Sequence, residues 1–258
     1  MISAGAAPIA IVSAMHEELA AVLALMPDER KVTVAGREFW QGHLHGHEVV
    51  AVLARIGKVA AATTAAVLAT RFGVDRVVFT GVAGGLGAGV QVGDAVVGSE
   101  FLQHDMNAMP LFPRHEVPSY GLSRFPADAG LAAALVEAAR EAMPQARVHR
   151  GLLISGDRFV STTTEARVLQ AELPDALAVE MEGAAFAQVC HDFGLPFAAV
   201  RTISDRADDA AHSDFLEFIR TVASPNSAAI VDALLRRLPS ASGFQARQRC
   251  HGTGFAGP

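Results

Sequence analysis

The sequence predicts a single α/β domain with a mainly parallel central sheet. Short, continuous apolar runs such as Ile9–Val12 and Phe197–Ile203 alternate along the chain with longer segments of helical spacing. This alternation is typical of strand–helix–strand units whose sheet is buried on both faces. No linker-like stretch interrupts it, so we expect one domain over residues 1–238. The Gly- and Ser-rich remainder, residues 239–258, is expected to be a disordered tail.

The composition is globular and lacks the signature of a nucleic-acid or membrane partner. Of the 258 residues, 51% are hydrophobic and 19% are charged, and the net charge is −6 without a Lys/Arg block. These values argue against nucleic acid and anionic membranes as partners. The first apolar run is too short for a signal peptide or a membrane span, so we expect a cytoplasmic protein.

The sequence offers no pattern for a metal ion or a cofactor. Cys190 and Cys250 imply neither a disulfide framework nor a metal cluster. His104, His115 and His212 lie in expected loops and lack metal-ligand spacing. We therefore expect no metal site and no cofactor.

The first half of the chain combines buried strands with helices rich in small or periodically apolar residues. In order, these elements are a strand at Ile9–Val12, a helix at Leu19–Met26, strands at Lys31–Trp40 and Val49–Ala54 joined by a turn at Gly42–Gly46, an Ala-rich helix at Val59–Thr70, a strand at Arg76–Thr80, and a strand at Val90–Ser99 with a turn at Gly93-Asp94. The glycine run Gly81–Gly87 follows a buried strand and is expected to be a loop. Glycine lets the backbone approach a ligand closely or adopt positive φ, although an ordinary tight turn is the alternative.

The second half continues the same alternation. In order, its elements are an amphipathic helix at Ala127–Met143, a strand at Arg147–Ser155, a short helix to Leu173 that starts at the capping box Thr162-x-x-Glu165, a strand at Ala176–Val179, a helix at Gly183–Val189, a strand at Phe197–Ile203, and a helix at Phe215–Leu238 capped by Ser213-Asp214. The segment His104–Tyr120 is a loop of unusual apolar content, so we expect it to be a lid or a dimer contact; disorder is the alternative, which the apolar content disfavours.

Three acidic residues, Glu18, Glu182 and Asp205, follow predicted strand ends, as do the glycine run and Phe159. A carboxylate at such a junction costs solvation free energy unless it has a partner. One acid alone can serve as a helix cap; for Glu180 and Glu182, the alternative is one cap and one solvated residue. If the strands are parallel, all these points gather on one rim of the sheet, where we expect a ligand site.

Seven motifs in fixed order carry a resemblance to a known family. They are Ile11–Leu19 (IVSAMHEEL), Ile56–Ala61 (IGKVAA), Thr80–Leu86 (TGVAGGL), Val92–Asp94 (VGD), Ser155–Phe159 (SGDRF), Ala178–Gly183 (AVEMEG) and Val200–Asp205 (VRTISD). The ordered set resembles the 5′-methylthioadenosine/S-adenosylhomocysteine nucleosidases of the purine nucleoside phosphorylase superfamily. The resemblance spans about residues 9 to 238. It implies a three-layer α-β-α fold with a mixed, mainly parallel sheet, and hydrolysis of the N-glycosidic bond of such nucleosides.

The resemblance also implies a role for each matching side chain. Glu18 would activate the attacking water, and Asp205 would be the general acid at adenine N7. The implied substrate-binding residues are Met15, Ile56 and Phe215 around the 5′-thio group, Ala83 and Gly84 in the glycine run, Phe159 and Val160 beside adenine, Met181 and Glu182 at the ribose with Glu180 in the same motif, Arg201 near the water, and Ser204 beside Asp205. A homodimer is implied, in which the loop Met106–Pro118 helps to close the neighbouring pocket.

The chemistry of the reaction agrees with these roles. Breaking the C1′–N9 bond of a nucleoside leaves positive charge on the sugar and negative charge on the purine. An acid must neutralise the purine while a base prepares water on the other face, as in inverting glycosidases. Asp205 needs a raised pKa to donate a proton near pH 7. Glu182, bonded to two hydroxyls, would favour the cationic sugar.

Two positions bear on the choice of nucleophile. Val82 stands where this family usually has Ser, and its side chain cannot hydrogen-bond a water or an oxyanion. Phe79 stands where the related phosphorylases have Arg, and a carboxylate at Glu18 would repel phosphate, so water is the expected nucleophile. Three alternatives stay open: a phosphorylase, a nucleosidase for another nucleoside of the 6-amino-6-deoxyfutalosine type, and a non-catalytic nucleoside-binding protein.

Overall fold

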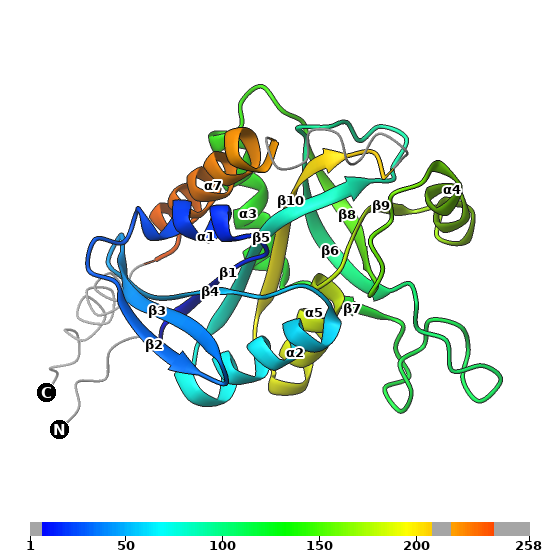
Figure 1. Cartoon of the computed structure of the whole chain (residues 1–258), viewed down its shortest axis with the longest axis horizontal. Coiled ribbons are helices and arrows are strands. Elements are labelled where there is room, and N and C mark those ends of the chain that lie inside the picture. Colours follow the sequence, from blue (N-terminus) through cyan, green and yellow to red (C-terminus); the bar gives the residue numbers. More distant parts are fainter. Residues whose placement is uncertain (1–6, 208–217, 240–258) are drawn as a thin grey trace, which may run out of the picture.

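The computed structural model describes residues 7–207 and 218–239 and has an α/β fold (Figure 1). Its sheet runs in the order β10-β6-β8-β9-β5-β1-β4-β3-β2, with β7 beside β6. The strands are β1 (Ile9–Ser13), β2 (Arg30–Val34), β3 (Arg37–Leu44), β4 (His47–Leu53), β5 (Arg76–Gly85), β6 (Ala95–Gln103), β7 (Arg124–Pro126), β8 (Val148–Ser155), β9 (Ala176–Glu180) and β10 (Phe197–Asp205). Because β10 also pairs with β5, the strands β5, β10, β6, β8 and β9 close into a ring.

The sheet is mixed, as predicted, and contains two parallel groups. Strands β4, β1, β5 and β10 run in one direction, and β6, β8 and β9 run in the other. The groups meet through the antiparallel pairs β10–β6 and β5–β9. Strands β5 and β9 overlap only at their carboxyl ends, where Gly84 pairs with Val179 and Gly85 with Ala178. The acidic residues therefore gather where strand ends from opposite directions meet, and the predicted single rim of parallel strands is wrong.

Helices cover both faces of the sheet, giving the predicted three layers (Figure 1). Helices α1, α3 and α7 pack together on one face, and α2 and α5 on the other. Helix α4 packs beside β8 and β9. The helices are α1 (His16–Leu23), α2 (Lys58–Val67), α3 (Ala129–Ala142), α4 (Thr163–Glu172), α5 (Gly183–Phe193) and α7 (Ser224–Arg237), with π-helical segments at Leu68–Phe72 and Ile219–Ala223.

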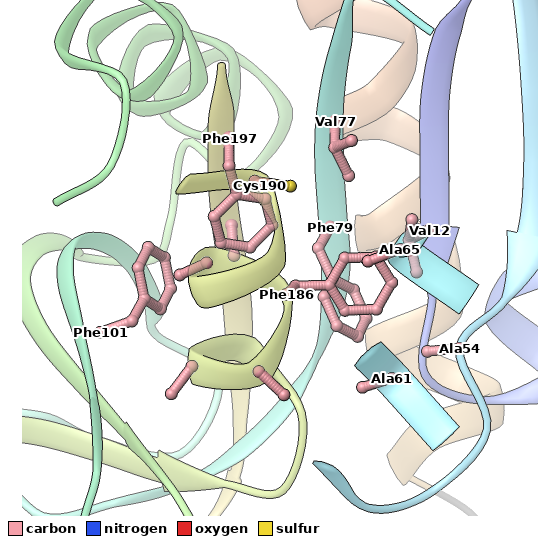
Figure 2. Close-up of a cluster of buried hydrophobic side chains, with 14 of the residues drawn as sticks. Val12, Ala54, Ala61, Ala65, Val77, Phe79, Phe101, Phe186, Cys190 and Phe197 are labelled. Atoms are coloured by element: carbon pink, nitrogen blue, oxygen red, sulfur yellow. The ribbon is translucent and has the colours of Figure 1, made fainter. Parts of the chain in front are cut away.

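Small residues on α2 and Phe186 on α5 pack into the core on one face of the sheet, together with phenylalanines from β5, β6 and β10, as Figure 2 shows. Phe186 of α5 lies with its ring centroid 4.8 Å from that of Phe79 on β5. Ala61 and Ala65 let α2 approach closely. Burying a phenylalanine side chain stabilises a fold by roughly 1.5–3 kcal/mol, so this layer holds α5 firmly behind the strand ends.

Several element boundaries differ from the sequence-based expectations. Lys31–Trp40 is two strands, because Ala35 and Gly36 turn the chain with φ of 50° and 69°. Strand β3 continues through Gly42, and the next turn lies at His45 and Gly46. Of the expected strand Val90–Ser99, the part from Ala95 onward belongs to β6, and the turn expected at Gly93-Asp94 lies at Val92 and Gly93, just before it.

Other expectations are confirmed or lie outside the described residues. Thr162 caps α4 by accepting a hydrogen bond from the Glu165 N–H, as the capping box predicts. The expected cap Ser213-Asp214, the expected start at Phe215 and residues 240–258 of the expected tail lie outside the described residues.

Candidate active site

A pocket lies where the carboxyl ends of β5, β9 and β10 meet the start of α1. Its cavity volume is about 160 Å³. Eleven of the predicted site residues line it: Met15, Ile56, Ala83, Gly84, Phe159, Val160, Glu180, Met181, Glu182, Ser204 and Asp205. Four further lining residues were not predicted to bind substrate: Ala14, Val82, Arg158 and Val179. Each of the four belongs to a motif that carries the resemblance, so proximity to the predicted residues was the signal that could have found them.

The glycine run forms the floor of the pocket as part of β5. The predicted loop is wrong up to Gly85, because these residues pair with β10 and β9. The glycines serve close packing here. A Cβ on Gly81 would lie 3.3 Å from Nη1 of Arg201, and one on Gly84 would lie 3.0 Å from Oδ1 of Asp205. Glycine at these positions therefore lets the strand pass directly against the side chains of Arg201 and Asp205.

Asp205 is fixed at the end of β10 by two hydrogen bonds. Its Oδ2 accepts from the Ser204 hydroxyl at 2.7 Å, and its Oδ1 accepts from the Ala207 N–H at 2.7 Å. The pairing of β10 with β5 shifts register between Ile203 and Asp205, which is a bulge-like irregularity. Neighbours on a regular strand face opposite sides of the sheet, so this irregularity allows Ser204 and Asp205 both to line the pocket.

Glu182 is a buried carboxyl group on the pocket wall. Its Oε1 accepts a hydrogen bond of 2.8 Å from the Gly57 N–H, at the start of α2. Burial, together with the negative charge of Glu180, raises the pKa of Glu182 to about 7. At neutral pH the group therefore exchanges readily between its neutral and ionised forms, and it is not the solvated residue of the alternative interpretation.

Glu180 supports the site through several donors at once. Its carboxylate accepts hydrogen bonds from the N–H groups of Glu182 and Gly183 and thereby caps the start of α5. It also accepts from the Ser155 hydroxyl. It also pairs with Arg201 Nη2 at 2.8 Å. The capping role raised as an alternative thus applies to Glu180, which also lines the pocket.

Arg201 lies fully buried beneath the pocket and does not line it. Its Nη1 donates to the carbonyl oxygens of Phe79 and Val200 at 3.2 Å, and its guanidinium carbon lies 4.0 Å from the centroid of the Phe79 ring. Phe79 therefore stacks against the arginine that holds Glu180. The structure places Arg201 among the carboxylates, as expected, while its direct contacts are with protein.

Glu18 is also fully buried, with 0% of its surface exposed. Its Oε2 accepts from the Met15 N–H at 3.0 Å, and its Oε1 accepts from the Ser227 hydroxyl at 3.1 Å. Burial raises the pKa of Glu18 above its usual range, and the positive charge of Arg201 opposes this shift. Glu18 does not line the pocket itself, but its partner Met15 does.

Two apolar side chains at the pocket mouth are well exposed. Ile56 is 66% exposed, and Phe159 is 42% exposed. A network of hydrogen bonds holds the two segments that carry them. Asp105 accepts from Lys58 Nζ at 2.6 Å and from the Asp157 N–H at 2.9 Å, and Asp157 accepts from the Lys58 N–H at 2.7 Å. The mouth of the pocket is therefore braced from the end of β6.

Comparisons with known proteins place this geometry in a family. The model of the phosphorylase superfamily matches residues 8–236. The chain belongs to this superfamily. Within it, the chain is similar to solved nucleosidases and a solved futalosine hydrolase. The pocket of this chain contains three carboxyl groups, those of Glu180, Glu182 and Asp205. The predicted site residue Phe215 lies outside the described residues.

Three similar structures show the range of these relatives. A 5′-methylthioadenosine/S-adenosylhomocysteine nucleosidase from Neisseria meningitidis, in complex with methylthio-immucillin-A, is 37% identical, with a TM-score of 0.85 over 90% of this chain and 100% of that chain. The futalosine hydrolase of Helicobacter pylori is 32% identical, with a TM-score of 0.83 over 90% and 98%. A nucleosidase of the first kind from Colwellia psychrerythraea, in complex with adenine, is 35% identical, with a TM-score of 0.84 over 89% and 95%.

The described residues show neither a metal-binding cluster nor a membrane-spanning helix. Within residues 7–207 and 218–239, no group of three or more His, Cys, Asp and Glu side chains is arranged to hold a metal ion. Across the same residues, no helix has the length and apolar character needed to cross a bilayer. The predicted cytoplasmic location stays a prediction.

Proposed function

We propose that this protein hydrolyses the N-glycosidic bond of 5′-thio-substituted adenosines, such as 5′-methylthioadenosine and S-adenosylhomocysteine. The products are adenine and the 5-thio-substituted ribose. The observation that carries the proposal is the placement of Asp205 and Glu182 on the wall of one pocket, with Glu18 hydrogen-bonded to Met15 on the same wall. The similarity to solved nucleosidases supports it.

Asp205 is the proposed general acid for the departing adenine. With adenine between Phe159 and the backbone beside Val160, Asp205 would donate its proton to N7. The bonding electrons of C1′–N9 then move into the purine ring, which leaves as neutral adenine. The Ser204 hydroxyl and the Ala207 N–H hold the carboxyl group in one orientation, so the proton is presented from a fixed position.

Glu182 is the proposed ribose anchor. Its free carboxyl oxygen would accept hydrogen bonds from the sugar hydroxyls while Oε1 stays bound to Gly57. A negative charge beside the sugar stabilises the positive charge that develops as the bond breaks. The pKa of about 7 means that the substrate hydroxyls and the positive charge that develops on the sugar can draw this group into its ionised form.

Glu18 is the proposed base that takes a proton from the attacking water. The water oxygen forms the new bond to C1′, and its proton goes to the Glu18 carboxylate. A base works best when its pKa lies near the operating pH, and the burial of Glu18 moves its pKa in that direction.

Charge at the pocket favours water over phosphate. Within the described ranges, the lining residues include three carboxyl groups and one basic side chain, Arg158, which pairs with Glu165. The buried Arg201 is already bound to Glu180. A phosphate dianion would have to bind beside the ionised Glu18 that we propose as the base, and the two arginines in and beneath the pocket are already paired.

Met15 and Ile56 supply an apolar end for the 5′ substituent, which suits a thioether. Such a surface discriminates weakly between small apolar groups, so a futalosine-type nucleoside is the alternative substrate.

Two variants test the assignment of acid and base. Glu18→Gln and Asp205→Asn keep size and hydrogen-bonding atoms but cannot take up or donate the proton. We expect each to slow adenine release from 5′-methylthioadenosine by at least about 100-fold, as general acid–base catalysis contributes 10²–10⁴-fold. Glu17→Gln is the matched control, because Glu17 is exposed on the same helix turn. Variants as fast as the parent would overturn the proposal.

A further inference from the structure

Because Glu18 is buried, its carboxylate depends on hydrogen-bond donors from the protein. A carboxylate shielded from water is costly unless its oxygens are bonded. The Met15 N–H, which comes from the same helix start, serves Oε2. The donor to Oε1 is Ser227 Oγ on α7, which is 209 positions further along the chain. The last described helix therefore reaches the carboxyl group to which we assign the activation of water.

The hydroxyl of Ser227 is used differently from that of its neighbour Ser224. Both serines are buried on α7. The Ser224 hydroxyl donates to the Ile219 carbonyl oxygen, one turn earlier, at 2.9 Å. Serine hydroxyls in helices commonly return to the preceding turn in this way. The Ser227 hydroxyl instead donates across the α1–α7 contact to Glu18, among the apolar core residues of these two helices.

We propose that Ser227 is a positioning residue that fixes the Glu18 carboxylate for the activation of water. The inference rests on the proposed function, because it assigns a purpose to a contact with the proposed base. A hydroxyl that donates to a carboxylate favours the ionised form, and Glu18 must be ionised to accept a proton. Two donors, one to each oxygen, also restrict rotation of the carboxylate. Helix α7 thereby controls both the charge and the direction of the base.

The other charged groups around Glu18 do not duplicate this role. Arg201, from β10, favours the ionised form through its charge alone. On α1, His16 and Glu17 are exposed, and Arg220 before α7 is exposed as well. The charged groups of α7 make ion pairs elsewhere: Asp232 with His45, Arg236 with Asp232 and Glu141, and Arg237 with Glu141.

The test compares Ser227→Ala with Ser224→Ala and with Ser227→Thr. Removing the Ser227 hydroxyl is expected to lower kcat about tenfold near neutral pH, with KM nearly unchanged, because hydrogen bonds to charged groups are the stronger ones. The acidic limb of the pH profile of kcat should move up by about one pH unit, since the pKa of Glu18 rises further. Ser224→Ala should keep the parent profile, and Ser227→Thr should restore most of the rate.

A second background separates positioning from a general packing defect. In Glu18→Gln, the further change Ser227→Ala should leave the residual rate unchanged, because its effect acts through the carboxylate. An equal loss in both backgrounds, or overlapping pH profiles of Ser227→Ala and Ser224→Ala, would overturn the proposal.

A readout independent of turnover distinguishes this proposal from the proposed function. The carboxyl carbon of Glu18 is followed by NMR in protein labelled at glutamate and assigned by its loss in Glu18→Gln. A higher pKa of Glu18 in Ser227→Ala supports the inference even if the parent enzyme hydrolyses none of the tested nucleosides, in which case the proposed function alone fails. An unchanged pKa of Glu18 rules the inference out.

Discussion

Glu182 illustrates how burial and a like charge set the chemistry of one residue. It lies within hydrogen-bond reach of one backbone donor, the Gly57 N–H, and beside the negative charge of Glu180. The pKa of about 7 lies above the usual 4.5, so the folded protein holds this proton more tightly than the unfolded chain. The stability from this group is complete below pH 4.5 and is lost as the pH rises through 7.

Replacing Glu182 by Gln should remove the loss of folding stability that accompanies ionisation of this group between pH 4.5 and about 7. Glutamine keeps an oxygen for the Gly57 N–H but carries no titrating group. The melting temperature of Glu182→Gln should exceed that of the parent by roughly 3–6 °C near pH 8, with a smaller difference near pH 5. Calorimetry at both pH values measures this, with Glu17→Gln as the exposed control. A difference that does not depend on pH would contradict the assignment of the raised pKa to Glu182.

At the scale of elements, the end of β5 decides how closely the backbone can approach the site. A Cβ on Gly84 would lie 2.9 Å from the Cβ of Ala207 and 3.0 Å from Oδ1 of Asp205. The change Gly84→Ala should therefore displace Asp205, the proposed general acid, and lower kcat by about 100-fold, because small misplacements of reacting groups are that costly. Gly89→Ala is the control, since its Cβ would meet no atom within 4 Å. Equal activity of the two variants would show that close packing at Gly84 does not matter for catalysis.

The same strand shows what the sequence could and could not predict. Apolar runs located the central strands, and the acids at their ends identified the pocket. Glycine signals a special backbone requirement without saying which one, so β5 was predicted to end five residues too early, at Thr80 instead of Gly85. The turn at Ala35 and Gly36 was missed because alanine is not a typical turn residue. Ser227 gave no signal, because a serine inside a helix has no pattern that reveals its partner.

At the scale of the whole molecule, the ring of five strands brings distant segments to one place. Residues near position 18 and near positions 182, 205 and 227 meet only because β5 pairs with both β9 and β10 while α1 packs on α7. Sequence order alone could not predict the antiparallel contact of β5 with β9, since strand direction depends on long-range pairing. The fold class was nevertheless predictable, because alternation of strands and helices restricts the architectures available.

The predicted homodimer, in which the loop Met106–Pro118 helps to close the neighbouring pocket, stays a prediction. Met109 and Leu111 of this loop are exposed apolar side chains, and Leu111 is 84% exposed. Exposed apolar side chains that gather in a patch mark interaction sites, so substitutions in this loop test the dimer. We expect Leu111→Asp to shift the mass measured by light scattering from dimer to monomer and to raise KM for the thio-substituted nucleoside by about tenfold, if apolar contact closes the pocket. Val168→Asp, at an exposed position of α4, is the control. A parent protein that is monomeric would contradict the dimer.

The most direct test of the proposed function is product analysis with 5′-methylthioadenosine, with and without inorganic phosphate. The account predicts free adenine and 5-methylthioribose at a rate that phosphate does not change, because the ionised Glu18 proposed as the base repels a competing anion and Arg201 is already paired with Glu180. A pentose 1-phosphate formed only when phosphate is present would contradict it, and would identify a phosphorylase instead.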